Sequence, residues 1–145
     1  MANRKQLDNC YMQVAEAHAA LSKAERKRVG CALVTANGVI LGGCNGLAPG
    51  SSNELEDKEG PFDVLVTKPE VIHAELNCLL KAARQGVSVV GATLYTTLSC
   101  CKPCSEMVAA AGIKRVVYKE AYRLSDGIEN LKKLNLEVEQ WRIYE

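Results

Sequence analysis

Two short motifs, His73-Ala74-Glu75 and Cys101-Lys102-Pro103-Cys104, carry side chains of the kinds that bind transition metals. One imidazole and two thiolates form a three-ligand zinc set, which leaves the fourth tetrahedral position open to water, as catalytic zinc sites do. We expect each motif to open a helix, where the dipole and the free N–H groups favour thiolates and lower their pKa. The pattern therefore predicts one zinc ion per chain, held by His73, Cys101 and Cys104.

Glu75 follows the predicted histidine ligand by two residues and suits proton transfer rather than metal binding. A catalytic zinc lowers the pKa of its bound water to about 7, and a nearby carboxylate can accept the released proton. Residues two apart lie about 200° apart around a regular helix, so His73 and Glu75 share a pocket only if His73 stands at a frayed first turn. A purely structural zinc site needs no such carboxylate, which argues against a zinc-stabilised interaction domain without activity.

The seven cysteines are an odd number, and without an export signal they are better interpreted as reduced thiols or metal ligands than as disulfides. Cys100 is a thiol that competes with the predicted ligands. The two-residue gap between Cys101 and Cys104 favours that pair, because it lets both sulfurs converge on one ion. The cysteines within apolar segments are interpreted as small core hydrophobes: Cys10, Cys31, Cys44 and Cys78.

The length of 145 residues fits a single domain, assigned to residues 1–145. The formal net charge of +1 creates no strong field that would draw the chain onto nucleic acid or an anionic membrane. No apolar run is long enough to span a bilayer, and the polar N-terminal stretch has no signal core. We therefore expect a cytoplasmic protein without nucleic-acid or membrane partners.

Hydrophobic periodicity predicts an α/β protein in which helices alternate with the later strands. Helices are expected over 7–24, 71–85, 101–111 and 124–134, and strands over 29–35, 39–44, 92–97, 114–118 and 136–141. The Asn37-Gly38 pair suits a tight antiparallel hairpin between the first two strands, whereas the alternation implies parallel pairing later. Residues 46–69 lack apolar periodicity and are interpreted as a long loop with a functional role.

Several stretches make the sequence similar to the cytidine deaminase superfamily, and within it to the short, phage-type deoxycytidylate deaminases. Beyond the metal motifs, they are residues 26–30, 43–50, 94–99 and 113–118, the second of which contains an Asn-Gly-x-x-Pro loop. The zinc motifs themselves match the zinc-deaminase signature. One departure is Cys100, which stands where the family usually has proline. The resemblance implies a cytidine-deaminase-like three-layer α/β/α sandwich with a mixed five-stranded sheet, formed by one zinc-dependent deaminase domain.

The activity that the resemblance implies is hydrolytic deamination of dCMP to dUMP, which supplies dTMP synthesis. Glu75 would move protons from water to a ring nitrogen and then to departing ammonia. Asn45 resembles the family residue that binds the sugar hydroxyl, although an Asn-Gly pair is also simply a turn. The remaining expected substrate contacts are Ala74, Ser99 and Tyr122, the last two in the base and phosphate pocket, and Arg26 at the phosphate. The basic run 26–28 that contains Arg26 is equally consistent with a solvated helix end.

Regulation is a further implication, because related enzymes are commonly hexamers activated by dCTP and inhibited by dTTP. Residues 46–69 are the natural place for an effector, and their acidic side chains would repel a triphosphate unless Mg²⁺ or Lys58 intervened. His18 is the only other histidine, so no second zinc is expected. The alternatives are deamination of a tRNA adenosine, which the near-neutral charge disfavours, or of free cytidine or guanine. If a phage encodes the chain, its location is the host cytoplasm.

Overall fold

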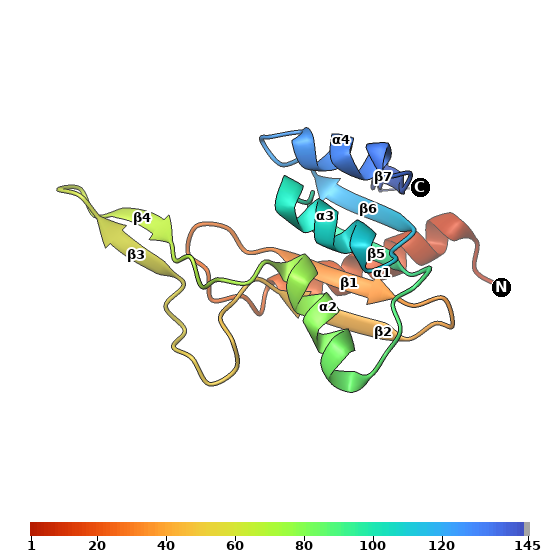
Figure 1. Ribbon diagram of the computed structural model, residues 1–145, viewed down its shortest axis with the longest axis horizontal. Coiled ribbons are helices and arrows are strands. Elements are labelled where there is room, and N and C mark those ends of the chain that lie inside the picture. The colour runs from red at the N-terminus through yellow and green to blue at the C-terminus, as the bar shows by residue number, and fades with distance from the viewer. Residues whose placement is uncertain (144–145) are drawn as a thin grey trace.

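The computed structural model describes residues 1–143 and contains a mixed five-stranded sheet (Figure 1). The strand order is β2-β1-β5-β6-β7. Strand β1 pairs antiparallel with β2 and β5, whereas β5 pairs parallel with β6 and β6 with β7. In chain order the elements are α1 (Arg4–Ala19), β1 (Gly30–Val34), β2 (Ile40–Cys44), β3 (Glu56–Glu59), β4 (Val64–Thr67), α2 (Ala74–Gln85), β5 (Thr93–Leu98), α3 (Lys102–Ala110), β6 (Arg115–Glu120), α4 (Asp126–Lys133) and β7 (Glu137–Gln140).

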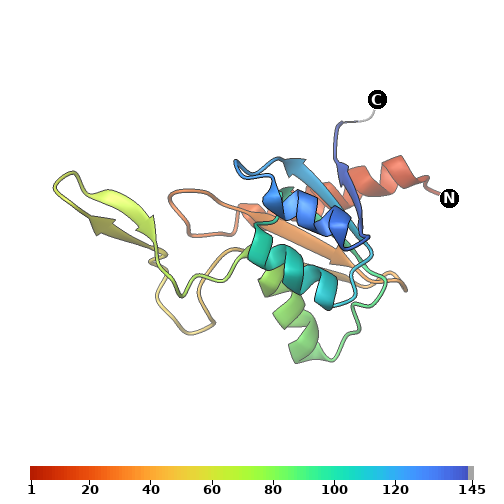
Figure 2. The same cartoon turned by 45° about the horizontal axis from the view of Figure 1, so that its top comes forward.

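Side chains that alternate along the strands divide the core between the two faces of the sheet. On β1, Cys31 and Leu33 join a buried cluster with residues of α2, α3 and α4. Ala32, between them, faces the other way and packs with Met12 of α1 and Tyr95 of β5. Figure 2 shows α2, α3 and α4 in front of the sheet and α1 behind it. The predicted three-layer sandwich with a mixed five-stranded sheet is therefore confirmed.

The N-terminal helix is shorter at its C-terminal end than the predicted 7–24. It begins after Asn3, whose side chain accepts the N–H of Gln6 in a capping box, and it ends at Ala19. Beyond the helix end, Ser22, itself buried, donates its hydroxyl to the carbonyl of Asn45 at 2.9 Å and so joins this segment to the end of β2. No helix within residues 1–143 is both long and apolar enough to cross a bilayer.

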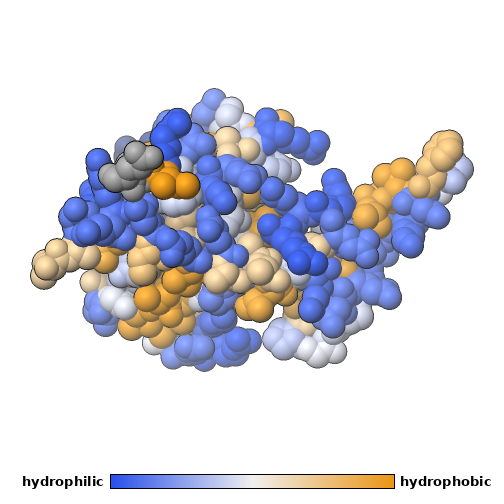
Figure 3. All heavy atoms as spheres, turned by 180° about the vertical axis from the view of Figure 1, so that it is seen from behind, coloured by the Kyte–Doolittle hydropathy of each residue, from blue (hydrophilic) through white to orange (hydrophobic). Residues whose placement is uncertain are grey.

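The prediction of an unstructured loop over residues 46–69 is wrong, because this stretch contains the antiparallel hairpin β3–β4. Only β4 is apolar, and its partner β3 reads Glu-Asp-Lys-Glu, so the pair gives no hydrophobic period. The hairpin forms a separate two-stranded sheet and projects from the body (Figure 1). Seen from behind in Figure 3, its outer part is coloured hydrophobic, in line with the exposed side chains of Phe62 and Val64.

The hairpin belongs to residues 46–72, called here the excursion, whose two ends lie side by side on the main body of the protein. Gly46 and Ile72 form an isolated bridge, with N–H to carbonyl distances of 3.0 and 2.8 Å in the two directions. Asn77 in α2 donates its side-chain amide to the carbonyl of Cys44 at 2.6 Å. The start of α2 is thereby fixed to the end of β2, independently of the path between them.

A buried ion pair joins α1 to the sheet on the face opposite the hydrophobic cluster of α2, α3 and α4. Arg115 donates both terminal nitrogens to Asp8, at 2.8 and 2.7 Å, and Tyr95 donates its hydroxyl to the same carboxylate at 2.7 Å. Burial opposes ionisation of Asp8, but these hydrogen bonds and the Arg115 charge outweigh it, and the pKa of Asp8 lies below its usual value. Asp8 and Arg115 are 4% and 5% exposed, so loss of one partner leaves a charge in the interior.

We expect Asp8→Asn to reduce the free energy of unfolding by about 3 kcal/mol at neutral pH, because breaking a buried pair strands its partner. The difference in free energy of unfolding between the variant and the wild type should shrink as pH falls below about 4. The lowered pKa of Asp8 contributes its full stabilisation only above the pKa of this carboxyl in the unfolded chain, and the contribution is lost as pH falls toward the pKa in the folded protein. Urea unfolding at several pH values measures both effects.

Glu16→Gln is the matched control, because Glu16 lies on the same helix and pairs with Lys119 at 3.0 Å in a partly exposed position. Its expected effect is below about 1 kcal/mol. Equal losses in the two variants would contradict the assignment of a special role to the buried pair.

Candidate active site

His73, Cys101 and Cys104 lie together where α2 and α3 begin. His73 is the N-cap of α2 and Cys101 the N-cap of α3, both in extended backbone conformations, and Cys104 lies in the first turn of α3. The Nδ1 atom of His73 is 3.2 Å from the Cys104 sulfur and 3.5 Å from the Cys101 sulfur. All three donor atoms lie within 4.8 Å of one another. The two motifs are therefore brought together as the sequence predicted.

The donor set fits a zinc ion. Tetrahedral zinc with typical bonds to sulfur and nitrogen places an N and an S ligand about 3.5 Å apart, close to the two separations given above. Exposure rises from Cys104, which is buried, through Cys101 to His73. The cluster thus has a closed side in the core and an open side toward solvent, as a three-ligand catalytic site requires.

The two ligand thiols differ in acidity. Hydrogen bonds from Cys104 and from His73 lower the pKa of Cys101 to about 4. The hydrogen bond to Cys101, together with burial, raises the pKa of Cys104. The hydrogen bond to Cys101 also raises the pKa of His73. Cys101 is therefore the more acidic thiol of the pair and the one that ionises first, consistent with its place at a helix N-terminus.

Glu75 is buried beside the cluster, in the first turn of α2. Its Oε1 atom lies 3.4 Å from the Thr96 hydroxyl oxygen, which donates its proton to the Leu98 carbonyl at 2.6 Å, and burial raises the pKa of Glu75 above its usual range. The extended conformation of His73 meets the condition set by helix geometry, because His73 and Glu75 both line one pocket. A buried carboxyl that gains a proton more readily than usual suits proton transfer.

Cys100 lies outside the cluster of donor atoms and is 1% exposed within the core. The main chain at this position is held by α4. A Cβ atom on Gly127 would come within 1.9 Å of the Cys100 carbonyl oxygen, so only glycine allows the helix to approach so closely. The backbone that presents Cys101 is therefore positioned by packing against a helix that itself carries no ligand.

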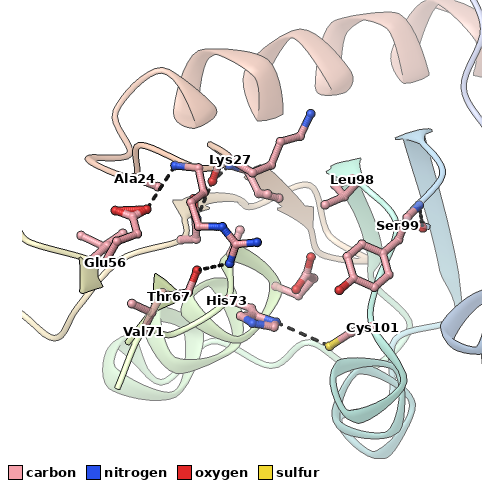
Figure 4. A pocket seen from close by; sticks show the side chains of 16 residues that line it. Ala24, Lys27, Glu56, Thr67, Val71, His73, Leu98, Ser99 and Cys101 are labelled. Atoms are coloured by element: carbon pink, nitrogen blue, oxygen red, sulfur yellow. Dashed lines mark hydrogen bonds between the residues drawn. The ribbon is translucent and has the colours of Figure 1, made fainter. Parts of the chain in front are cut away.

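A cavity of about 270 Å³ opens beside the cluster, and the other residues that the sequence analysis predicted as site residues line it (Figure 4). Cys104, which the cavity does not reach, lies behind Cys101 in the core. The predicted residues that line the cavity are Arg26, Asn45, His73, Ala74, Glu75, Ser99, Cys101 and Tyr122.

Two of the predicted substrate contacts also hold the cavity wall in place. The Asn45 side chain accepts the N–H of Val29 and donates to the carbonyl of Lys27, both at 2.9 Å, which leaves one amide hydrogen for other partners. The Ser99 hydroxyl accepts the N–H of Tyr122 at 2.7 Å. Asn45 thus has the backbone role expected of a turn residue and a place in the cavity as well.

Four cavity residues from the excursion were not predicted as site residues: Leu55, Glu56, Thr67 and Val71. The first three stand at the base of the β3–β4 hairpin, where Arg26 donates to the Thr67 hydroxyl at 3.1 Å. A signal for the hairpin is present in the sequence, because the β-branched residues of 64–67 follow the Gly60-Pro61 turn pair. The acidic partner strand conceals it from a search for apolar periodicity.

A family model described as the cytidine and deoxycytidylate deaminase zinc-binding region matches residues 5–120. The chain belongs to this family. Its zinc-binding region covers every metal-ligand candidate and the whole cavity except Tyr122.

The chain is similar in sequence to deoxycytidylate deaminases encoded by phages. The deoxycytidylate deaminase of Enterobacteria phage T2 is 57% identical over 51 residues, which cover 35% of this chain and 27% of that protein. The deoxycytidylate deaminase of Mycobacterium phage D29 is 33% identical over 125 residues, or 80% of this chain and 96% of that protein. The chain therefore spans about a quarter of the phage T2 protein and nearly all of the phage D29 protein.

A solved structure extends the similarity to the fold. The dCMP deaminase of cyanophage S-TIM5, solved with dCMP and dUMP, matches with a TM-score of 0.84 at 38% identity, over 97% of this chain and 100% of that chain. Its sheet and helices therefore correspond to those of this deaminase-family chain.

We expect the purified protein to hold close to one zinc ion per chain, and Cys101→Ser to lose most of it, because a hydroxyl is a much poorer zinc ligand than a thiolate. Metal analysis of dialysed protein measures the content. Cys100→Ser is the matched control and should keep its zinc. Retention in Cys101→Ser with loss in Cys100→Ser would reverse the ligand assignment.

Proposed function

We propose that this chain hydrolyses dCMP to dUMP and ammonia, with His73, Cys101 and Cys104 as zinc ligands and Glu75 as the proton carrier. The observation that carries the proposal is the placement of Glu75, a buried carboxyl with a raised pKa, beside a three-donor cluster at one end of a nucleotide-sized cavity. The similarity to deoxycytidylate deaminases supports the choice of substrate.

A zinc ion held by the three donors would lower the pKa of a water to about 7 and so supply a nucleophile at neutral pH. Glu75 accepts the proton of the attacking water and passes it to the ring nitrogen N3 of cytosine. Glu75 then moves the proton of the new C4 hydroxyl to the amino group, so that the C4–N bond breaks as ammonia leaves and C4 keeps the oxygen as a carbonyl. The Thr96 hydroxyl donates its only proton to the Leu98 carbonyl at 2.6 Å, so its oxygen, 3.4 Å from Oε1, is placed to accept a hydrogen bond from Glu75 when this carboxyl is protonated.

The cavity walls orient the nucleotide along the path from cluster to entrance. Ala74, Ser99 and Tyr122 stand near the cluster, where the base must lie for C4 to reach the nucleophile. Asn45 can offer its remaining amide hydrogen to a sugar hydroxyl. Arg26, exposed at the hairpin side of the cavity, suits the phosphate, because a guanidinium binds phosphate in bidentate fashion.

The alternative functions fit these features less well. A tRNA adenosine deaminase needs a basic surface, whereas the formal net charge is +1. Deamination of free cytidine or guanine leaves Arg26 without a phosphate to bind. A zinc-stabilised interaction domain gains nothing from burying Glu75, since an interior carboxylate is costly to ionise.

The proposal includes a hexamer regulated by dCTP and dTTP in the cytoplasm, or in the host cytoplasm if a phage encodes the chain. A triphosphate effector with Mg²⁺ would find carboxylates on the hairpin, where Asp57 is half-exposed and lies 3.9 Å from Lys68. The exposed apolar side chains of Phe62 and Val64 offer a surface for a neighbouring subunit.

We predict that Glu75→Gln keeps its zinc and its fold but loses turnover by a factor of about 10² to 10⁴, because an amide cannot carry the proton. Glu70→Gln, which neutralises an exposed carboxylate shortly before α2, is the control and should retain activity. The measurement is ammonia release with metal content determined in parallel. Turnover like that of wild type in Glu75→Gln would eliminate the mechanism.

We predict that dCMP is preferred over cytidine, since each charge-assisted contact to the phosphate adds about 1.5–3 kcal/mol, or one to two orders of magnitude in specificity. The dCTP and dTTP effectors should shift the dCMP saturation curve in opposite directions, because an effector acts through its differential affinity for two states. Steady-state rates with each nucleotide and Mg²⁺ test both statements. Equal efficiency on cytidine would remove the phosphate contact, and unchanged curves would remove the regulation.

A further inference from the structure

One carboxylate of the cavity wall is bound to main-chain donors as an external anion would be. Both oxygens of Glu56 accept the N–H of Glu25, at 3.2 and 3.0 Å, and Oε2 also accepts the N–H of Arg26 at 3.2 Å. Consecutive N–H groups that converge on one acceptor form a small anion-binding concavity. Glu56 fills it from the first residue of β3.

The side chain of Arg26 adds a cation to the same place. Its guanidinium donates to the neutral Thr67 hydroxyl at 3.1 Å, and among residues 1–143 it forms no salt bridge. Two main-chain N–H groups and an unpaired guanidinium are the donors that a phosphate monoester needs. The donor set for a phosphate is thus present, with an internal carboxylate on part of it.

This anion site opens into the cavity at a distance from the cluster of metal-ligand candidates. Ala24, Arg26, Glu56 and Thr67 all line the cavity. Figure 4 shows Glu56 and Thr67 on one side, Cys101 and Ser99 on the other, and His73 between them. A nucleotide whose base lies at the cluster therefore extends its 5′-phosphate toward Glu56.

We propose that the N–H groups of Glu25 and Arg26, with the Arg26 guanidinium, form the phosphate subsite, and that Glu56 is an internal competitor which the phosphate displaces. The proposal rests on the proposed function for the identity of the ligand, a nucleoside 5′-monophosphate. Two anions cannot share these donors, because like charges at contact distance repel. Entry of the phosphate therefore releases the hydrogen bonds by which Glu56 attaches the hairpin base to the N–H groups of residues 25 and 26.

The competing explanation is that Glu56 only fastens the hairpin to the body. The two explanations differ in sign. If Glu56 competes, removal of its charge strengthens binding of a phosphate-bearing ligand and leaves a ligand without phosphate unchanged. If Glu56 only fastens the hairpin, its loss weakens or spares both ligands alike.

The test is calorimetric binding of dUMP, deoxyuridine and inorganic phosphate to the zinc-loaded protein. Glu56→Gln should bind dUMP about fivefold to tenfold more tightly, because a neutral acceptor holds N–H groups more weakly than a carboxylate. Its affinity for deoxyuridine should not change. Arg26→Gln should weaken dUMP by about tenfold or more, again without an effect on deoxyuridine.

Glu59→Gln is the matched control, because it removes the same charge from the exposed far end of β3 and should leave every affinity unchanged. In the wild-type protein, the amide resonances of Glu25 and Arg26 should shift on addition of dUMP or phosphate but not of deoxyuridine, which requires no variant to fold. Unchanged or weaker dUMP binding by Glu56→Gln, or equal wild-type affinity for dUMP and deoxyuridine, would overturn the subsite. Loss of the proposed function is distinguishable, since absent dCMP turnover with tighter dUMP binding by Glu56→Gln rejects the reaction and keeps the subsite.

Discussion

The chemistry of this chain depends on two helices beginning at the same point. The extended backbone of His73 and Cys101, immediately before α2 and α3, places one imidazole and two sulfurs within 4.8 Å. The Gly46–Ile72 bridge fixes the first helix start. The second is fixed by the Ser99 N–H, which donates to the carbonyl of Glu120 at 2.9 Å, and by the close approach of Gly127. The donor geometry is therefore set by the main chain, and a change of side-chain rotamer alone could not assemble it.

The buried ion pair that joins α1 to the sheet is separate from the residues that line the cavity. The buried Asp8–Arg115 pair lies between α1 and the sheet, whereas the metal donors and the cavity belong to α2, α3 and the segments beside them. Among the cavity residues, Glu75 is a carboxyl buried next to the core. Its raised pKa is a cost to stability that is explained by the proton transfer proposed for it.

The sequence alone could predict most of the sheet and the metal cluster, because both have strong local signals. Helix and strand periodicities identify the α/β order, and the paired His-x-Glu and Cys-x-x-Cys motifs identify the donors. The hairpin could not be predicted from apolar periodicity, because Glu56 to Glu59 are polar and the stabilising partner, β4, is apolar on its own. Glu56 and Thr67 were missed with it, and no local pattern indicates that a glutamate will turn back onto the N–H groups of Glu25 and Arg26.

The excursion closed by the Gly46–Ile72 bridge should unfold separately from the main sheet. A two-stranded hairpin on its own is marginally stable in water, and β3–β4 forms no pairing with the main sheet. Its amide protons should exchange with solvent by local opening, whereas those of β1 and β5 should exchange only when the whole domain unfolds. Because the bridge and Asn77 keep α2 in register, such an opening uncovers the cavity mouth without moving His73. One wall of the cavity can therefore fluctuate on its own time scale while the main-chain positions that carry the three donor side chains stay in place.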